Sequence, residues 1–578
     1  MSVPGMGAVP IEGGYAFRVW APHAAGVSVV GDFNGWDAGA HAMEQEGNGH
    51  WYAEVPGAQM WQEYQYLVDT GEQQIHRIDP RALAVTNSVG NGLLYDHAAF
   101  DWEGDDFLPP AQHEMVVYET HIGSFVDTGD GPASLKDVAG KLDYLRSLGV
   151  NAIELMPLME FAGDYSWGYN PAHVFAVEHT YGGPEALKKF VREAHRHGIA
   201  VIIDVVYNHF GPSDLSIWQF DGWSENGKGG IYFYNDHRSS TPWGDTRPDY
   251  GRQEVRDFIL DNARMWLRDY HADGLRLDMT PYMRRVEGTH GDDIPEGWAM
   301  MRMIGELVRT DFPHKVVYAE DLHNIPAVTS VEPDGAAMHA QWDNQFVHPV
   351  REALIARDDA QRSVTAVAKA VTHTYHHAFD RVIYTESHDK VSNGSARITS
   401  EVEGDNPTGW TAQKRATLGA GLVLTSPGVP MLFQGQEFLE DEWFRDTVPL
   451  DWERAWAFRD ITKMFRDLIS LRRNLDGDTA GLTGPHTTLV CADEDAKVLA
   501  YVRSTGDDQH VLVALNLSAH AVQRRVELPG GHWRVRFNSD ARTYSQLFGD
   551  HATPDVHVQE GAGLLDLGPY SVVVYVPA

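Results

Sequence analysis

The sequence predicts an α/β protein, a (β/α)8 TIM barrel flanked by N-terminal and C-terminal β-sandwich domains. In the central part of the chain, short apolar runs alternate with amphipathic helical segments, which is typical of parallel βαβ units. Eight such runs favour a closed barrel over a doubly wound sheet, which rarely needs eight strands. At both ends of the chain, the pattern changes to short strands broken by turns, without long helical periodicity.

The first domain is predicted to span residues 1–105. Its strand candidates are "YAFRVWAP", "GVSVVGDF", "HWYAEV" and "EYQYLV". The segment 101–114, "DWEGDDFLPPAQHE", has the charge and proline content of a linker. We therefore expect a small β-sandwich followed by a linker.

The barrel domain is predicted to span residues 106–475. Helix candidates such as "GPEALKKFVREAHRHG" lie between the strands, and several end at Gly, which is favoured at helix C-termini. One βα connection, the loop at 210–252, is much longer than the usual few residues, and such loops are usually functional. The strand candidates are 116–123, 152–158, 200–209, 274–280, 315–322, 338–343, 381–389 and 429–438.

The last domain is predicted to span residues 476–578. It follows the helix candidate "RDITKMFRDLISLRRN", after which the runs "KVLAYVRS", "HVLVALNLS" and "SVVVYVP" return to strand patterning. A second β-sandwich is therefore expected at the C-terminal end.

The composition limits the partners of this chain. With 46 Lys plus Arg against 82 Asp plus Glu, the net charge of -36 repels phosphate backbones and anionic lipid surfaces. We therefore expect no nucleic-acid and no membrane partner, and a neutral ligand fits better. No apolar run approaches the roughly 20 residues of a spanning helix, and the first residues do not resemble a signal peptide. The cytoplasm is the expected location, in agreement with the single Cys491, and the oligomeric state is left open.

Polar and charged residues follow the predicted strands at equivalent depths. In a barrel, the residues at the C-terminal ends of the strands carry the chemistry. Several carboxylates at this depth would cost desolvation that packing alone does not offset, so a functional site is favoured over salt bridges at the barrel rim. The residues are Asp204, Asn208 and His209 after the third strand, Arg276 and Asp278 after the fourth, Glu320 and Asp321 after the fifth, and His388 and Asp389 after the seventh.

The long loop is rich in aromatic residues. Some of them are expected to pack the loop itself, and others to line a cleft for sugar rings. The aromatic residues are Trp218, Phe220, Trp223, Tyr232, Phe233, Tyr234 and Trp243, of which Trp243 is taken as a substrate-binding candidate.

Four short motifs resemble those of the α-amylase superfamily, glycoside hydrolase family 13. They are "DVVYNH" (204–209), "GLRLD" (274–278), "YAED" (318–321) and "ESHD" (386–389), in order and each at the end of a barrel strand. The N-terminal stretch "FRVWAPHAAGVSVVGDFNGWD" is similar to a family 48 carbohydrate-binding module.

This resemblance implies the roles of the site residues. Asp278 corresponds to the nucleophile, Glu320 to the general acid/base and Asp389 to the third carboxylate. In "SWGYNP" (166–171), Tyr169 corresponds to an aromatic platform under the reacting sugar. His209 and His388 are expected to hydrogen-bond sugar hydroxyls, and Asp204 to support the floor of the site.

A retaining glycosidase needs one ionised and one protonated carboxyl group close together. Arg276 lies two residues before Asp278 and therefore on the same face of the strand, where its charge is expected to lower the pKa of Asp278. Glu320, beside other carboxylates, is expected to have a raised pKa.

The resemblance implies an enzyme that cleaves α-1,4-glucosidic bonds of glycogen, starch or maltooligosaccharides by double displacement. Branching transglycosylation is the favoured reaction. The alternatives are an α-amylase-type hydrolase, a maltooligosyl trehalose trehalohydrolase, and a catalytically silent glycogen-binding protein. No cofactor is expected, and no metal, because no dense acidic loop with ligand spacing accompanies the long third loop.

Overall fold

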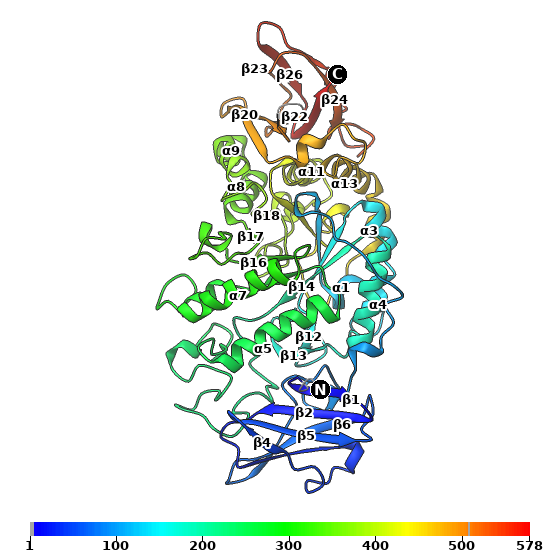
Figure 1. Ribbon diagram of the computed structural model, residues 1–578. Coiled ribbons are helices and arrows are strands. Elements are labelled where there is room, and N and C mark those ends of the chain that lie inside the picture. The colour runs from blue at the N-terminus through cyan, green and yellow to red at the C-terminus, as the bar shows by residue number, and fades with distance from the viewer. Residues whose placement is uncertain (1–4, 507–508) are drawn as a thin grey trace.

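The computed structural model describes residues 5–506 and 509–578. Figure 1 shows three units in a row, with the N-terminal β-domain at one end, a barrel in the middle and the C-terminal β-domain at the other end. The predicted fold class is confirmed, since eight parallel strands close into a barrel between two β-domains. In the described ranges, no helix is both long and apolar enough to cross a membrane.

The N-terminal domain is a sandwich of two antiparallel sheets. Alternating strand residues such as Phe17, Val19, Tyr64 and Tyr66 are buried and form its core. One sheet has the order β1 (Gly7–Ile11), β2 (Gly14–Trp20), β5 (His50–Pro56), β4 (Glu44–Gly47). The other has the order β3 (Gly26–Gly31), β6 (Glu63–Asp69), β9 (Gly92–Leu93), β8 (Ala84–Val85), and β7 (Gln74–Arg77) pairs with β6.

The barrel strands follow one another around the barrel in chain order, and the last strand pairs with the first. Every residue of these strands is buried, which explains their near-continuous apolar character. The strands are β10 (Val117–Thr120), β11 (Ala152–Leu155), β14 (Ala200–Val205), β15 (Gly274–Leu277), β16 (Val316–Ala319), β17 (Ala340–Trp342), β18 (Arg381–Ile383) and β19 (Val429–Phe433).

The strands are shorter than predicted at their C-terminal ends. The sequence predicts one strand over 381–389, for example, whereas β18 ends at Ile383. The polar residues that follow leave the ladder and enter the βα loops, so they face the end of the barrel. A hairpin of β12 (Met159–Phe161) and β13 (Pro171–Val177) is inserted after β11.

Amphipathic helices cover the outside of the barrel. In α4 (Gly183–Arg196), Pro184 occupies the first turn, and Leu187, Val191 and Ala194 form its buried stripe. The other helices are α1 (Ile122–Phe125), α2 (Leu135–Ala139), α3 (Leu142–Leu148), α5 (Gln253–Arg264), α6 (Pro281–Arg284), α7 (Pro295–Asp311), α8 (Asn344–Ile355), α9 (Val364–Thr372), α10 (Ile398–Val402), α11 (Trp410–Thr425), α12 (Trp452–Ala457) and α13 (Arg459–Arg472).

The long loop between β14 and α5 is held against the N-terminal domain. The backbone N–H of His23 donates to Asp221 Oδ2 at 2.9 Å, and Arg77 Nε donates to the carbonyl of Phe220 at 2.9 Å. The loop is therefore fixed from two sides, by the barrel and by the first domain.

The C-terminal domain has one large and one small antiparallel sheet. Its core contains Val498, Leu512, Trp533 and Tyr575. The large sheet has the order β20 (His486–Asp493), β21 (Val498–Ser504), β22 (His510–Asn516), β27 (Ser571–Pro577), β24 (His532–Asn538), β25 (Val556–His557), and the small sheet pairs β23 (Val522–Glu527) with β26 (Ala562–Leu567).

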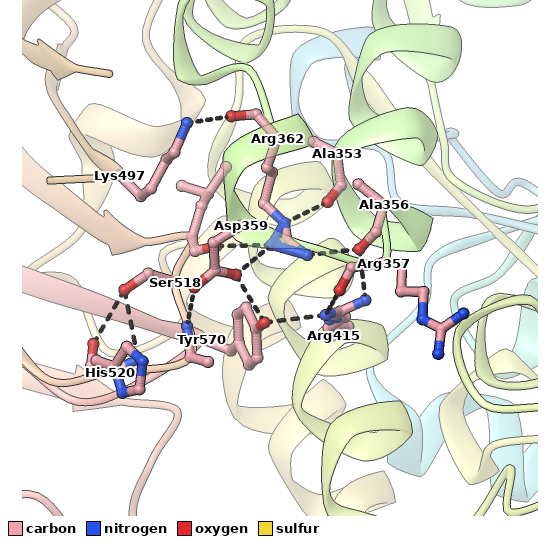
Figure 2. Close-up of polar contacts among 12 residues, drawn as sticks. Ala353, Ala356, Arg357, Asp359, Arg362, Arg415, Lys497, Ser518, His520 and Tyr570 are labelled. Carbon is pink, nitrogen blue, oxygen red and sulfur yellow. Dashed lines mark hydrogen bonds and ion pairs between the residues drawn. The ribbon is translucent and has the colours of Figure 1, made fainter. Parts of the chain in front are cut away.

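Buried arginines join this domain to the C-terminal end of α8 (Figure 2). Arg362 Nε donates to the carbonyl of Ala353 at 2.7 Å, and Arg415 Nη1 donates to that of Ala356 at 2.8 Å. These carbonyls have no partner inside the helix, so the guanidinium groups replace the missing donors. Arg415 Nη2 also donates to Tyr570 Oη of the C-terminal domain at 2.9 Å.

The division of the chain into domains at residues 105/106 and 475/476 stays a prediction.

Candidate active site

A single buried arginine connects three carboxylates at the end of the barrel. Arg276 Nη1 lies 2.6 Å from Asp204 Oδ2 and 3.3 Å from Asp278 Oδ1. Its Nη2 lies 2.7 Å from Glu320 Oε2, and the arginine side chain has no exposed surface. Asp204 and Arg276 lie opposite each other in the adjacent strands β14 and β15, and Asp278 and Glu320 directly follow β15 and β16. In the structure, the predicted nucleophile Asp278 and the predicted acid/base Glu320 therefore both contact the guanidinium of Arg276.

Asp278 is held by hydrogen bonds as well as by charge. Asn208 Nδ2 donates to Asp278 Oδ2 and to its backbone carbonyl, both at 2.7 Å. Burial raises the pKa of Asp278, and the Arg276 charge lowers it, with a net rise to about 6. Arg276 thus lowers the pKa of Asp278 as expected, but the desolvation of the buried carboxylate outweighs this attraction, so the net pKa is raised.

Glu320 has the raised pKa that the sequence predicts. Burial raises its pKa to about 8, Arg276 opposes the rise, and the charges of Asp278 and Asp389 add to it. The backbone N–H of Met279 donates to Glu320 Oε2 at 3.0 Å. Near pH 7, the group with a pKa of about 6 is mostly ionised and the group with a pKa of about 8 is mostly protonated.

His388 forms the next part of the site. Its Nδ1 lies 2.5 Å from Glu119 Oε1, and its Nε2 lies 3.6 Å from Asp389 Oδ1. Burial lowers the pKa of His388, but the charges of Asp389 and Glu119 outweigh this effect and raise it to about 9. The imidazole is therefore a cation at neutral pH, facing an Asp389 side chain that is 41% exposed.

Tyr169 lies on the floor of the site. Its hydroxyl donates to Asp204 Oδ2 at 2.6 Å, and its ring stacks on that of His388 with centroids 5.0 Å apart. The guanidinium of Arg276 lies 5.6 Å from the centroid of the Tyr169 ring and 4.4 Å from that of Trp342. Tyr169 is therefore held by contacts with Asp204, His388 and Arg276.

His209 is buried beside Tyr169 and Trp243. It has no exposed surface, and its Nε2 lies 2.8 Å from the carbonyl oxygen of Tyr169. Its Nδ1 contacts Asn208 Oδ1, and its ring stacks on Trp243 with centroids 4.4 Å apart. Both ring nitrogens therefore face oxygen atoms of the protein, and the expected hydrogen bond from His209 to a sugar hydroxyl stays a prediction.

Part of this site, including Asp278, His388 and Asp389, lines a cavity of about 480 Å³. Trp243 lines it, whereas Phe220, Phe233 and Tyr234 of the long loop are buried within the loop. The aromatic content of that loop thus serves mainly its own packing. The cavity is lined by Tyr165, Ser166, Trp167, Tyr169, Asn170, Trp243, Asp278, Met279, His388, Asp389, Asn393 and Asp446.

Two charged residues in the motifs have structural partners instead. Glu386 accepts from Arg397 Nη1 at 3.0 Å and from the backbone N–H of Ile398 at 2.7 Å. Asp321 accepts from Arg284 Nη2 at 2.9 Å and Nε at 3.0 Å. These carboxylates anchor the loops that carry their neighbours.

Sequence reasoning missed Glu119 and Glu154. Both lie in buried barrel strands, β10 and β11, directly beside each other in the register. Among the described residues, Glu154 Oε2 has no hydrogen-bond partner, and burial raises the pKa of Glu154 well above its ordinary value. A carboxylate inside an apolar strand run, "VVYETHIG" or "AIELMPL", was the signal that could have identified them.

A group of potential metal ligands lies on the β12–β13 hairpin. Donor atoms of Glu160, Glu178 and His179 lie within 4.8 Å of one another. The carboxylates are engaged within the protein, since Glu160 accepts from the His179 N–H and Glu178 from the N–H groups of Phe161 and Thr180. None of these residues lines the cavity of the candidate site.

Three family matches cover most of the chain. Residues 5–82 match Carbohydrate-binding module 48 (Isoamylase N-terminal domain). Residues 121–215 and 214–479 match the catalytic domain named Alpha amylase, and residues 489–578 match the Alpha amylase C-terminal all-beta domain.

Similar proteins were found among curated sequences and solved structures. The 1,4-alpha-glucan branching enzyme GlgB of Marinobacter nauticus is 30% identical, over 92% of this chain and 88% of its own. The GlgB of Corynebacterium jeikeium is 29% identical, over 97% of this chain and 82% of its own. The structure of a putative alpha amylase from Salmonella typhimurium matches all of both chains with a TM-score of 0.76 and 22% identity. A pullulanase from Anoxybacillus sp. LM18-11, complexed with maltotetraose, matches all of this chain and 88% of its own with a TM-score of 0.77 and 21% identity.

Proposed function

Since the chain belongs to the α-amylase family and is an enzyme of glycoside hydrolase family 13, we propose that it is a 1,4-α-glucan branching enzyme. Its substrate is an α-glucan such as glycogen, starch or a maltooligosaccharide. It cleaves an α-1,4 bond by double displacement and transfers the released chain to a 6-hydroxyl group.

One observation carries the proposed mechanism, the contact of Arg276 with both Asp278 and Glu320. The ionised Asp278 attacks the anomeric carbon while Glu320 donates its proton to the leaving oxygen. The resulting glycosyl ester is then attacked by an acceptor hydroxyl, whose proton returns to Glu320. The pKa values of about 6 and about 8 support this division of roles.

The remaining groups act on the sugar in the cavity. Asp389 is exposed enough to accept hydrogen bonds from ring hydroxyls, and the adjacent His388 cation donates from Nε2. The face of Tyr169 supports the ring from below. Positive charge that develops on the sugar is stabilised by the ionised carboxylates around it.

The branching reaction is favoured by the relatives rather than by the geometry. Eight similar curated sequences are named 1,4-alpha-glucan branching enzyme GlgB, at 29% to 31% identity. The carbohydrate-binding module and a structural relative bound to maltotetraose support an α-glucan ligand. A silent glycogen-binding protein is disfavoured, because Asp278, Glu320 and Asp389 are all present.

Incubation with amylose tests the reaction. A branching enzyme lowers iodine staining without a matching rise in reducing ends, and proton NMR shows new α-1,6 signals. Staining loss with stoichiometric reducing ends would identify a hydrolase. Trehalose released from maltooligosyl trehalose, with amylose untouched, would identify a trehalohydrolase.

A further inference from the structure

The segment 101–107, which joins the first domain to the barrel, lies against two histidines. It contains no helix or strand, and we call it the strap. The ring of Phe107 stacks on that of His195 with centroids 4.4 Å apart, and the ring of Trp102 stacks on that of His271 with centroids 3.7 Å apart. His195 lies in the last turn of α4, and His271 lies just before β15. The strap is therefore held at the end of the barrel opposite the catalytic cavity.

His195 lies between two carboxylates. Its Nδ1 lies 2.9 Å from Asp105 Oδ2 of the strap, and its Nε2 lies 3.0 Å from Asp273 Oδ2. A neutral imidazole has one N–H group and one lone pair, whereas an imidazolium donates from both nitrogens. Since carboxylate oxygens only accept hydrogen bonds, both contacts are satisfied together when His195 is a cation. The side chains of His195, Asp105 and Asp273 are 4%, 8% and 2% exposed, so water has little access to replace a lost partner.

Asp105 also contacts the second histidine. Its Oδ2 lies 2.9 Å from His271 Nδ1. One carboxylate of the strap thus joins two histidines from separate elements of the barrel domain. If the bond to His195 is lost, Asp105 keeps only its contact with the more exposed His271.

The other charged groups around His195 are two arginines, a glutamate and a lysine. Arg192 and Arg196 of α4 both contact Glu103 of the strap, whose side chain is half exposed, so these ion pairs hold the strap weakly. Lys315, just before β16, donates from Nζ to two backbone carbonyls at 2.8 Å and faces the charges of Asp273 and Asp105. The histidines are therefore the groups of this cluster that change charge near neutral pH.

We propose that the strap is a pH-sensitive lock, which the His195 cation keeps closed against the barrel and which opens when this cation loses its proton. Burial lowers the pKa of His195, but the contacts with Asp273 and Asp105 outweigh this effect and raise it above its ordinary value. Because the pKa is higher in the closed state, the stabilisation is complete below about pH 6.5 and is lost as the pH rises through the raised value. The lock does not depend on which α-glucan reaction the enzyme catalyses.

Hydrogen exchange of the strap measures the lock. Exchange of the amides of residues 101–107 is followed by mass spectrometry from about pH 6 to about pH 9, and each rate is divided by that of the unfolded peptide at the same pH. In the wild type, this protection is expected to fall roughly tenfold over the range, since one unit of pKa shift corresponds to a tenfold change. His195→Gln is expected to give low protection at every pH.

Asp105→Asn is expected to move the midpoint of the loss down by about one pH unit, because one of the two charges that favour the imidazolium is removed. The matched control is His197→Gln on the same helix. The ring of His197 contacts Asp143 and the carbonyl of Glu193, so this variant should keep the wild-type midpoint.

Constant protection in the wild type over this pH range would refute the lock. The same midpoint in the wild type and in Asp105→Asn would also refute it, because the titrating group would then lie elsewhere. If His195→Gln does not fold, Asp105→Asn still decides, since Asp273 remains beside His195 in that variant. An unchanged circular dichroism spectrum would show that the opening is local, whereas a spectrum that changes with the same midpoint would indicate global unfolding and overturn the lock.

Discussion

Glu119 and His388 form a paired contact at the end of the barrel, although they lie 269 positions apart in the chain. Glu119 Oε1 lies 2.5 Å from His388 Nδ1, and Glu119 Oε2 accepts from the backbone N–H of His388 at 3.1 Å. The carboxylate therefore fixes both the position and the charge of the imidazole. Glu119 does not line the cavity, so it is a positioning residue.

Glu119→Gln is expected to lower the pKa of His388, because a negative charge that favours the imidazolium is removed. We expect kcat/KM to fall roughly ten- to hundredfold as His388 loses its orientation. An NMR titration of His388 and the pH profile of kcat/KM check this. Glu154→Gln is the matched control, because burial raises the pKa of Glu154, which favours its neutral form, and the amide keeps the same shape. An unchanged His388 titration in Glu119→Gln would contradict the prediction.

Asp278→Asn is expected to reduce turnover by roughly ten-thousand-fold, since the amide cannot form the glycosyl ester. Circular dichroism should show a native fold, because the hydrogen bond from Asn208 has an amide oxygen as an alternative acceptor. Trapping with a fluorinated glucosyl donor, followed by peptide mass spectrometry, should label Asp278 in the wild type. A label on Glu320 would reverse the two roles.

The activity is expected to follow a bell-shaped pH profile. Asp278 must be ionised, so activity rises as the pH increases through about 6, and Glu320 must be protonated, so activity falls as the pH increases through about 8. The optimum therefore lies near neutral pH. Because the two carboxyl groups are close, the two apparent pKa values of the profile describe the pair and not the individual residues.

Glu320→Gln should remove the alkaline limb and should affect activated leaving groups, such as a glucosyl fluoride, least. Asp321→Asn is the control for this neighbourhood. It weakens the contact with Arg284 and should lower thermal stability without a dependence on the leaving group. A uniform loss across leaving groups in Glu320→Gln would contradict its role as proton donor.

Arg415→Met is expected to destabilise the protein by about 2 kcal/mol or more, because buried carbonyls at the end of α8 lose their donor. Urea unfolding with a tryptophan fluorescence readout measures this. Arg357→Met is the matched control, since Arg357 contributes only its carbonyl to the junction and its side chain points away in Figure 2. Equal stability losses in both variants would show that the capping contacts contribute nothing specific.

The barrel and its central residues could be predicted because strand and site share one local signal, an apolar run that ends in charged residues. Asp204, Arg276, Asp278 and Glu320 all follow that pattern, and the structure brings them together. The pKa of Asp278 could not be predicted, because it depends on burial by segments distant in the sequence.

Contacts between residues that are far apart in the sequence could not be predicted either. The bond between Glu119 and His388 joins the first strand of the barrel to the loop after the seventh. The stacking of His209 on Trp243 depends on the path of the long loop. In each case, the residue type was visible in the sequence, but its partner was not.

The pairing of β19 with β10, with Met431 opposite Val117, has a consequence for the newly made chain. During synthesis, the first barrel strand leaves the ribosome long before the strand that must lie beside it. Until that strand is made, one edge of β10 has no neighbouring strand. The contact between Glu119 and His388 then lies in a barrel that has not yet closed. Pairing between strands that are far apart in the sequence slows folding. Meanwhile, the unpaired edge of β10 can pair with strands of other chains. Catalytic activity should therefore arise abruptly and late, only after the chain is released beyond residue 433.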